Sequence, residues 1–389
     1  MLSICHIITR MIVGGAQENT LYTIRRHLEK GHKVTLLTGP SDGPEGSLLE
    51  RICPEGLEIV EIPDLVRNLN PLRDWRALKQ LRRFFRERTF DVVHTHSSKA
   101  GILGRMAAWD AGVPFVCHTV HGQAFHPFQS WWRNKLYIAA ERFAARRCHR
   151  IFAVAQAMID QCVQAGVDAP GKYRVVFSGM ELDTFTGSRR SPELRARLEI
   201  PEDAPVVGMV ARLFELKGHD TMIAAAPEII RSFPEVRFLF VGDGILRDKL
   251  EAEAERLGVR RNFVFAGLVP PGEVPDYIAQ MDVLAHLSLR EGLPRACVQA
   301  LASAVPAVAF PLDGTPEVVF HEKTGMLVQL GEGAAAGVAD AVKRLLADRE
   351  LRLRLGAEGQ RFVTEHFDWR LMGDILEEEY DFGVSKARG

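Results

Sequence analysis

The chain has 389 residues, of which 47% are hydrophobic and 25% charged, and its formal net charge is −1. This length is too great for one ordinary hydrophobic core and suits two domains of roughly 150–200 residues each. The composition is that of a soluble globular protein. No segment approaches the roughly 20 consecutive apolar residues that span a bilayer, which argues against a membrane-spanning protein.

The first residues form a short apolar run without a basic leader or a small-residue cleavage site. We interpret this run as a buried strand and not as a signal peptide. The cysteines are scattered and form no C-x-x-C pair: Cys5, Cys53, Cys117, Cys148, Cys162 and Cys297. Reduced thiols fit this pattern better than disulfides or a zinc site, so we expect a cytoplasmic protein.

Charge is distributed unevenly along the chain. Residues 1–180 contain 24 Lys and Arg against 16 Asp and Glu, whereas residues 181–389 contain 25 against 34. The net charges are therefore +8 and −9. This difference predicts a domain boundary near residues 180–200 and gives the first part an affinity for something anionic.

Short apolar, β-rich runs alternate with longer amphipathic stretches along the chain. In the first part, strands are predicted at Ile4–Ile8, Val34–Leu37, Asp91–Val93, Phe115–Cys117, Ile151–Val154 and Arg174–Phe177. Helices are predicted between them at Glu18–Lys30, Asp74–Arg88, Ala100–Ala111 and Trp132–Cys148. In the second part, strands are predicted at Val206–Val210, Arg237–Val241, Phe263–Phe265, Asp282–His286 and Val305–Ala309.

This alternation predicts an α/β protein with parallel, doubly wound sheets covered by helices on both faces. We expect two Rossmann-like domains, residues 1–182 and 183–365, with the polar segment 183–205 as the linker. Residues 366–389 form a helical tail that we expect to pack back on the first domain. Ligands of open α/β sheets bind beyond the carboxyl ends of the strands, so a site between the two domains is expected.

Two adjacent glycines, Gly14 and Gly15, follow the first predicted strand and lead into a helix. Glycine lets the backbone approach a ligand closely, and a helix N-terminus offers free N–H groups to an anion. An ordinary tight turn explains the pair equally well.

Two cations follow the strand Val206–Val210. Arg212 lies at its end, and Lys217 precedes Gly218 at the start of the next helix. Such a pair suits a diphosphate, which Arg grips through two donors and Lys contacts as a point charge. The alternative is a pair of solvated surface cations.

A glycine turn, Gly242-Asp-Gly244, follows the strand Arg237–Val241. It resembles the beginning of a dinucleotide-binding fingerprint, but Arg247 stands where the third glycine is required. The departure weakens an NAD interpretation, although the turn can still pass close to a nucleotide.

The segment Ser288–Ser303 is the most informative. Pro294 fits the first turn of a helix, which holds Glu291 beside the helix N-terminus, and Gly292 leaves room for a ligand. An ionised carboxylate here accepts hydrogen bonds from sugar hydroxyls, while the loop N–H groups face a phosphate. A carboxylate that merely favours the helix dipole is the alternative.

In this order, the motifs resemble the retaining GT-B glycosyltransferases of family 4, over nearly the whole chain. The resemblance rests on Gly14-Gly15, Asp91-Val-Val-His-Thr-His96, Val120-His-Gly122, Arg212 with Lys217-Gly218, Gly242-Asp-Gly244, Arg290-Glu-Gly-Leu-Pro294 and Asp313-Gly-Thr-Pro-Glu317. It implies two facing Rossmann-like domains with an interdomain cleft. It also implies transfer of a sugar from a nucleotide-diphosphate donor, a UDP- or GDP-sugar, to a saccharide or lipid-linked saccharide.

The resemblance also implies residue roles. Arg212 and Lys217 would neutralise the donor diphosphate and stabilise it as leaving group. Glu291 would hold the hydroxyls of the donor sugar, and His121 would lie beside the reacting sugar. The remaining donor-binding positions would be Gly14, Gly15, Gly242, Gly244, Gly292, Leu293 and Gln299.

The implied reaction keeps the anomeric configuration through an oxocarbenium-like transition state. The departing phosphate would take the acceptor's proton, so no protein nucleophile and no cofactor are needed. One position departs from the family's pattern of two glutamates separated by seven residues, because the second is Gln299. Its amide oxygen can still accept a hydrogen bond from the nucleotide ribose, but without the charge.

Histidines occur close together as His94 with His96 and as His118, His121 and His126. Strand alternation sends His118 and His121 to opposite faces, and neither a helical H-E-x-x-H nor a D-x-D pair occurs. We therefore predict no metal site.

Two basic stretches carry most of the charge of the first part. Residues 67–88 hold eight Arg and Lys against two acids, and residues 125–150 combine basic side chains with Phe128, Trp131 and Trp132. Basic helices with interfacial aromatic residues suit an anionic membrane surface, so the protein would act at the inner face of the membrane. The alternative is a solvated helix with its aromatic side chains in the core. Nucleic acid is disfavoured because no binding module is recognisable.

Other functions remain open. A nucleotide-sugar epimerase with the GT-B architecture would convert the donor without an acceptor, and a non-catalytic protein would bind the donor and transfer nothing. A glucan phosphorylase would need pyridoxal phosphate and a much longer chain.

Overall fold

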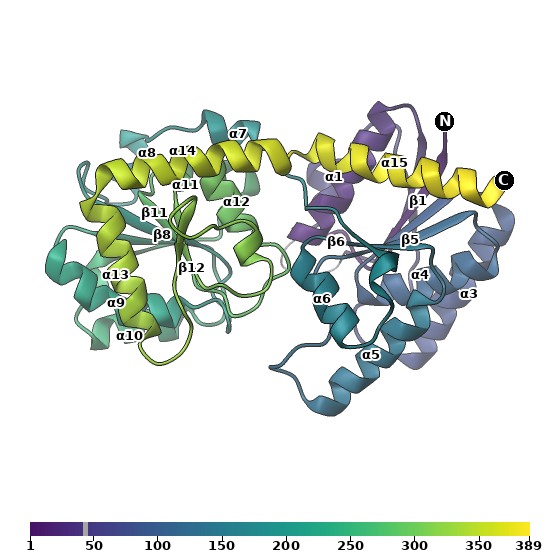
Figure 1. The fold of residues 1–389 in the computed structure, drawn as a ribbon, viewed down its shortest axis with the longest axis horizontal. Coiled ribbons are helices and arrows are strands. Elements are labelled where there is room, and N and C mark those ends of the chain that lie inside the picture. The colour runs from purple at the N-terminus through teal and green to yellow at the C-terminus, as the bar shows by residue number, and fades with distance from the viewer. Residues whose placement is uncertain (42–45) are drawn as a thin grey trace. The chain divides into compact units, whose positions relative to one another are not determined.

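The structure of the protein is a computed structural model that describes residues 1–41 and 46–389 (Figure 1). The chain divides into two compact units. The first unit comprises Met1–Met180 and Asp368–Gly389, and the second comprises Glu181–Phe367. The second unit is therefore an insertion between Met180 and Asp368, which meet where the N–H of Trp369 donates to the carbonyl of Met180 at 3.3 Å.

The first unit contains a sheet of seven parallel strands in the order β3-β2-β1-β4-β5-β6-β7. The strands are β1 (Ser3–Ile8), β2 (Lys33–Thr38), β3 (Glu58–Glu61), β4 (Val92–His96), β5 (Phe115–Val120), β6 (Arg150–Ala153) and β7 (Tyr173–Val175). The order reverses between β1 and β4, which makes the carboxyl ends of these two strands the expected ligand position in a doubly wound sheet.

Helices cover both faces of this sheet. They are α1 (Gly15–Glu29), α2 (Leu48–Arg51), α3 (Pro71–Glu87), α4 (Ser98–Asp110), α5 (Trp131–Ala145), α6 (Gln156–Gln164), the short η1 (Pro170–Lys172) and α15 (Trp369–Arg388). Successive strand residues point to opposite faces. Ile7 of β1 therefore packs with Leu81 of α3 on one face, whereas Ile4 packs with Leu376 of α15 on the other.

The C-terminal helix α15 is bound to the first unit by apolar and ionic contacts. Its buried Tyr380 and Met372 belong to the same cluster as Ile4. The guanidinium of Arg26 in α1 donates to Asp374 at 2.9 and 3.0 Å. Because this ion pair is partly shielded from water, it fixes the orientation of the helix more firmly than an exposed pair would.

The second unit contains six parallel strands in the order β10-β9-β8-β11-β12-β13. They are β8 (Val206–Val210), β9 (Arg237–Val241), β10 (Phe263–Gly267), β11 (Val283–His286), β12 (Ala307–Ala309) and β13 (Gly325–Leu327). The order reverses between β8 and β11, so the loops that follow these two strands meet at the carboxyl edge of the sheet.

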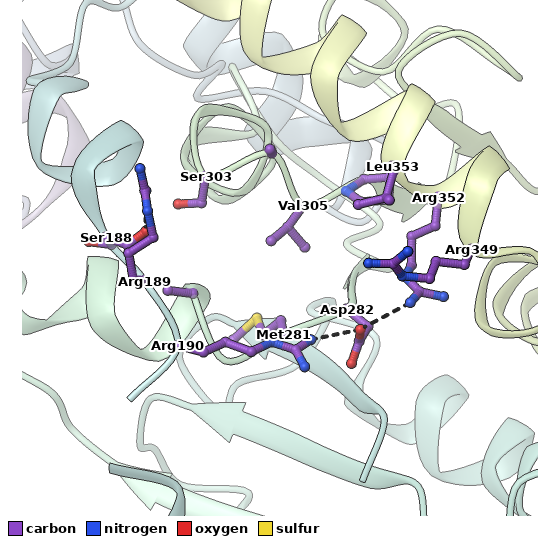
Figure 2. Close-up of a pocket in the computed structure, with 13 residues that line it drawn as sticks. Ser188, Arg189, Arg190, Met281, Asp282, Ser303, Val305, Arg349, Arg352 and Leu353 are labelled. Atoms are coloured by element: carbon purple, nitrogen blue, oxygen red, sulfur yellow. Dashed lines mark hydrogen bonds and ion pairs between the residues drawn. The ribbon is translucent and has the colours of Figure 1, made fainter. Parts of the chain in front are cut away.

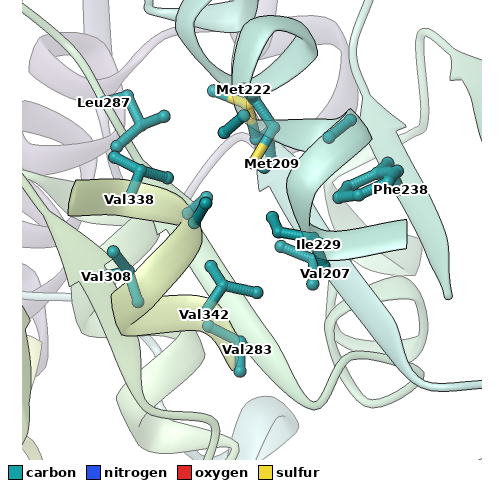
Figure 3. Close-up of a cluster of buried hydrophobic side chains, with 14 of the residues drawn as sticks. Val207, Met209, Met222, Ile229, Phe238, Val283, Leu287, Val308, Val338 and Val342 are labelled. Atoms are coloured by element: carbon teal, nitrogen blue, oxygen red, sulfur yellow. The ribbon is translucent and has the colours of Figure 1, made fainter. Parts of the chain in front are cut away.

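The helices of the second unit again cover two faces. They are α7 (Asp183–Gly187), α8 (Pro192–Arg197), α9 (His219–Ser232), α10 (Arg247–Arg256), α11 (Val274–Ile278), α12 (Arg295–Ala302), α13 (Ala334–Ala347) and α14 (Arg349–His366), with the short η2 (Arg260–Asn262), η3 (Pro271–Glu273) and η4 (Thr315–Glu317). Figure 3 shows Ile229 of α9 and Val342 of α13 packed over Val207 and Val283 of the central strands. This apolar core holds the strand ends, and the loops beyond them, in place.

The polar segment 183–205, expected as a linker, is instead folded into the second unit. It contains α7 and α8, and the hydroxyl of Ser191 caps α8 by accepting from the N–H of Leu194 at 3.1 Å. The buried Arg195 donates to the carbonyls of Pro201 and Ala204 at 2.7 and 2.6 Å. A polar composition misled the prediction because these polar groups are satisfied internally.

Candidate active site

Lys217 and Glu291 meet at the point where the strand order of the second unit reverses. Lys217 lies in the loop after β8 and Glu291 in the loop after β11, and Lys217 Nζ is 2.7 Å from Glu291 Oε1. Since β8 and β11 are neighbours, their following loops lie at the same edge of the sheet. The structure thus joins two residues that are far apart in the sequence and were both predicted to bind the donor.

Hydrogen bonds fix the backbone of both loops. The N–H of Leu289 donates to the carbonyl of Leu216 at 2.8 Å, and the Ser288 hydroxyl donates to the same carbonyl at 3.1 Å. The N–H of Glu291 donates to Asp313 Oδ2 at 2.7 Å, which ties in the loop after β12. Three loops from three neighbouring strands therefore form one connected surface.

This surface stores backbone strain. Leu216 and Asp313 adopt φ angles of 66° and 49°, in the left-handed region that non-glycine residues rarely occupy. Gly218, with φ of 78°, starts α9, and a Cβ there would lie 2.1 Å from the carbonyl oxygen of Leu287. Strain of this kind persists where the surrounding structure enforces it and is concentrated at functional sites.

The Glu291 carboxyl is held in its charged form. Burial would raise its pKa, but the neighbouring His286 and Lys217, with a hydrogen bond from Lys217, lower it below the ordinary value. A charged carboxylate accepts hydrogen bonds and donates none. It is therefore prepared to hold hydroxyl groups of a ligand.

His286 is a site residue that the sequence interpretation missed. It is the last residue of β11, it is buried, and its Nε2 lies 3.6 Å from Glu291 Oε1. Burial lowers the pKa of His286, although Glu291 opposes this shift. The sequence could have indicated His286, because it ends a predicted central strand and the carboxyl ends of parallel strands are where ligands bind.

Arg212 lies beside the glycine turn after β9. The N–H of Leu213 donates to the carbonyl of Asp243 at 3.0 Å, which binds the two loops together. A Cβ at Gly242, where φ is 137°, would lie 2.1 Å from the carbonyl oxygen of Ala211, and one at Gly244 would lie 2.5 Å from that of Leu213. Glycine is required at both positions because the backbone of this turn touches the backbone of the loop after β8. The Arg212 side chain is exposed, so its guanidinium is accessible to a ligand.

The remaining predicted donor residues of this unit follow Glu291. Gly292 is half-buried and Leu293 buried, immediately before α12. Gln299 lies within α12. Among the residues that the structure describes, no hydrogen bond joins the Gln299 side chain to Lys217 or Glu291.

The predicted residues of the first unit also lie at a carboxyl edge. The helix α1 begins at Gly15, with Gly14 as its N-cap after the β1 loop. The hydroxyls of Thr9 and Ser97 are 2.8 Å apart and connect the loops after β1 and β4. His121 directly follows β5, the next strand in the sheet.

A buried row of histidines supports His121. His121 Nε2 is 3.1 Å from His96 Nδ1, and His96 Nε2 is 3.0 Å from His6 Nδ1. His94 contacts the hydroxyls of Tyr380 and of Thr119, the latter at 2.7 Å. Burial lowers the pKa of His6 to about 3 and lowers the pKa of His94 and of His96 well below the ordinary value. The row is therefore neutral at physiological pH.

The same row contains a group with the spacing of metal ligands. One ring nitrogen each of His6, His94 and His96 lies within 4.8 Å of the others. The sequence showed His94 close to His96 but gave no reason to add His6, and we predicted no metal site. His118 faces the other side of the sheet, where its Nδ1 contacts the Thr95 hydroxyl at 2.9 Å. Apart from Nε2 of His6, the ring nitrogens of the three have hydrogen-bond partners among the described residues. A neutral hydrogen-bonded network therefore accounts for the group.

Comparisons with known proteins identify the family of this chain. Residues 13–184 match the family model for Glycosyltransferase Family 4, and residues 190–362 match the model for Glycosyl transferases group 1. The chain is 28% identical over 356 residues, 90% of each chain, to UDP-Gal:alpha-D-GlcNAc-diphosphoundecaprenol alpha-1,3-galactosyltransferase of Escherichia coli. It is 35% identical over 200 residues to a GDP-mannose-dependent alpha-(1-6)-phosphatidylinositol monomannoside mannosyltransferase of Mycobacterium tuberculosis, covering 49% of this chain and 51% of the other.

Solved structures share the fold. HepE of Anabaena, in complex with UDP-glucose, aligns with a TM-score of 0.81 at 22% identity, covering 98% of this chain and all of the other. Sucrose-phosphate synthase of Thermosynechococcus elongatus aligns with a TM-score of 0.82 at 18% identity, covering 99% and 100%. Both units are thus the Rossmann-like domains of a GT-B fold. The two parallel sheets and the two family matches lead to one conclusion: the chain belongs to the family 4 glycosyltransferases of the GT-B fold and is a glycosyltransferase.

Proposed function

We propose that this glycosyltransferase moves a sugar, with retention of anomeric configuration and without a metal ion, from a UDP-sugar to a lipid-linked saccharide. The observation that carries the proposal is the 2.7 Å contact between Lys217 and Glu291 where the strand order reverses. The contact brings a cation and a carboxylate together at the edge where parallel sheets bind ligands, and in our proposal the cation binds the diphosphate and the carboxylate binds the sugar.

The charges suit departure of a nucleoside diphosphate. Negative charge grows on the leaving phosphate as the glycosidic bond breaks, and Lys217 and Arg212 stabilise that charge in place of a metal ion. Glu291 accepts hydrogen bonds from hydroxyls of the donor sugar and holds the ring in position. The backbone of Gly292 and Leu293 lies next to these groups and completes the donor site.

Retention follows if the acceptor attacks from the side that the diphosphate leaves. The departing phosphate oxygen takes the proton of the acceptor hydroxyl, so the protein supplies no nucleophile. Gly14 and Gly15 close over the phosphates, Gly242 and Gly244 admit the nucleotide, and His121 binds the reacting sugar. Gln299 accepts a hydrogen bond from the ribose through its amide oxygen.

The named relatives support the choice of donor and acceptor. The galactosyltransferase that matches 90% of this chain uses UDP-galactose and a GlcNAc-diphosphoundecaprenol acceptor, according to its name. The HepE structure contains UDP-glucose. We therefore place UDP-sugars first among donors and polyprenyl-diphosphate saccharides first among acceptors.

The first unit offers a surface that suits a lipid acceptor. Helices α3 and α5 follow β3 and β5, so each helix begins at the carboxyl edge of the sheet, where His121 also lies. Large apolar side chains are exposed near these two helix starts: Leu69, Leu72, Trp75, Phe128, Trp131, Trp132 and Leu136. Phe85 of α3 packs into the core, as the alternative interpretation expected. Trp75, Trp131 and Trp132 do not and are exposed.

Basic groups accompany these aromatic side chains. Lys135 Nζ lies 4.7 Å from the ring of Trp131, and the Arg133 guanidinium lies 5.2 Å from the ring of Trp132. Aromatic rings and cations in this combination suit the headgroup layer of an anionic membrane. None of the described helices is both long enough and apolar enough to cross a bilayer. We propose peripheral binding at the cytoplasmic face of the membrane.

The transfer experiment uses the purified protein, a panel of UDP- and GDP-sugars, and synthetic GlcNAc-diphosphate carried on a prenyl chain, with EDTA present. We expect one UDP-sugar to give a disaccharide product whose new linkage keeps the donor's configuration, as read from the NMR coupling of the anomeric proton. Inversion of configuration, or activity that EDTA abolishes, would contradict the mechanism.

The same incubation separates the alternatives. An epimerase would convert the donor in the absence of acceptor, and a binding protein would leave donor and acceptor unchanged while still binding the donor. Transfer from GDP-mannose and from no UDP-sugar would agree with the proposed mechanism but contradict the proposed UDP-sugar donor.

Membrane binding is tested by co-sedimentation with phosphatidylglycerol vesicles. We expect Trp131→Ser with Trp132→Ser to release the protein from the vesicles. Phe382→Ser is the matched control, because Phe382 is equally exposed but lies on α15, on the other face of the sheet. Equal binding of all three proteins would contradict the proposed surface.

A further inference from the structure

A hollow of about 450 Å³ lies in the second unit, away from the candidate active site (Figure 2). Asp282 and Pro306, which line it, directly precede β11 and β12, so the hollow lies at the amino ends of these strands. Glu291 follows the carboxyl end of β11. The two places are therefore on opposite edges of one sheet, separated by about 13 Å of strand.

Four arginines line this hollow: Arg189, Arg190, Arg349 and Arg352. We call it the arginine pocket. Figure 2 shows Arg349 and Arg352 on one side of it and Arg189 on the opposite side. Asp282 is the one carboxylate among the lining residues, which leaves an excess of positive charge. This excess stands out in a part of the chain whose net charge is negative.

Two of the arginines are fixed by that carboxylate. Arg190 Nη2 lies 2.7 Å from Asp282 Oδ1, and Arg352 Nη2 lies 3.5 Å from the same oxygen. The other carboxylate oxygen accepts from the N–H of Val206 at 2.9 Å. Arg352 also donates to the carbonyl of Leu345 at 2.8 Å. Asp282 thus anchors both guanidiniums but neutralises only one charge.

The other two arginines keep their charge uncompensated. Arg189 donates to the carbonyls of Thr186 and Ser188, at 2.9 and 2.8 Å, which carry no net charge. Arg349 is the exposed first residue of α14, and neither it nor Arg189 forms an ion pair with any described residue. The N-terminus of this helix is capped by Asp348, which accepts from the N–H of Leu351 at 2.8 Å, so the positive charge here comes from the arginine side chains.

The rest of the lining is apolar or weakly polar. Met281, Val305 and Leu353 contribute carbon surface, and the Ser303 hydroxyl lies at the rim of the hollow in Figure 2. The volume falls within the range of small-molecule sites, roughly 300–1,000 Å³. Such a lining accommodates a carbon skeleton as well as an anionic group.

We propose that the arginine pocket binds a small phosphorylated organic molecule, such as a sugar phosphate, at a site separate from the donor site. The guanidinium fork matches phosphate oxygens through two parallel N–H donors. Arg349 and Arg189 supply the free charge, and Arg190 and Arg352 are held in place by Asp282. The apolar walls receive the carbon skeleton. Binding here leaves the donor loops at the other edge of the sheet open, so the two ligands do not compete.

The pocket is tested by calorimetric titration of pyrophosphate into Lys217→Met protein, in which the donor site is weakened. We expect one site per chain. Adding Arg189→Gln and Arg349→Gln should weaken binding at least tenfold, without unfolding the protein, because both side chains are exposed and form no ion pair. The matched control is Arg354→Gln, which changes an exposed arginine of α14 that does not line the pocket.

A crystal soaked in tungstate, an electron-dense phosphate analogue, gives an independent test. Anomalous density beside Arg349 would support the pocket. Absence of pyrophosphate binding, equal affinity of the doubly substituted protein and the Arg354→Gln control, or tungstate only at the donor loops would overturn the proposal. The test does not depend on glycosyl transfer, so its result is independent of whether the proposed function is correct.

Discussion

The contact between Lys217 and Glu291 gives a sharp prediction when its cation is removed. Lys217→Met keeps the length of the side chain and deletes the charge that lies 2.7 Å from Glu291 Oε1. The two side chains are 29% and 18% exposed, so solvent screens the pair and its loss should cost about 1 kcal/mol of stability. In a domain of this size, that is a fall in Tm of about 2–4 °C.

The effect on transfer should be much larger. Loss of one group that stabilises charge on the leaving oxygen costs about 3–4 kcal/mol of transition-state stabilisation, or a 100- to 1,000-fold fall in kcat. The assay is initial-rate transfer from the preferred UDP-sugar, with Tm measured on the same preparation. Lys249→Met, which changes an exposed lysine of α10, is the control and should keep full activity. A Lys217→Met enzyme with kcat within threefold of the parent would refute the assignment.

Three further predictions follow. Gly242→Ala should reduce donor affinity at least tenfold and lower Tm, because the added Cβ would lie 2.1 Å from the Ala211 carbonyl oxygen in a backbone that favours glycine; equal donor titrations would contradict this. His286→Asn should raise the pKa of Glu291, because His286 lowers it, and should move the acidic limb of the kcat profile to higher pH; an unmoved limb would show that His286 does not act on Glu291. The free energy of unfolding should fall by about 1.4 kcal/mol per pH unit for each buried histidine below about pH 6.5, because His6, with a folded pKa of about 3, takes up its proton only on unfolding. Urea titrations between pH 7.5 and pH 5 measure this, and a constant stability would show that the row is protonated in the folded state.

Most of the central strands could be predicted because both of their faces are buried. The run Val206–Val210 is apolar throughout and matches β8 residue for residue. The edge strand β3, Glu58–Glu61, was missed because three of its four residues are exposed and charge interrupts any apolar pattern. The strand β13, Gly325–Leu327, is too short for any periodicity to appear.

The candidate site was partly predictable for a related reason. Arg212, Lys217 and Glu291 each follow a predicted strand, and the parallel-sheet rule places such residues at one edge. The sequence contained no information on which strands are neighbours, so the direct contact of Lys217 with Glu291 was not foreseen. For the same reason the row formed by His6, on β1, with His96, on β4, was not predicted, since the two residues are 90 positions apart in the sequence and meet only because their strands pair.

The central claim is that the loops around Lys217 and Glu291 bind a nucleoside-diphosphate sugar without a metal ion. Its most direct test is a thermal-shift panel of nucleoside diphosphates and their sugars, run with EDTA, on the parent protein and on Lys217→Met. A ligand at a hundredfold excess over its Kd stabilises the folded state by about 2.7 kcal/mol. We predict a shift with UDP and UDP-sugars that survives EDTA and is lost in Lys217→Met. No shift with any diphosphate, or an equal shift in the two proteins, would contradict the claim.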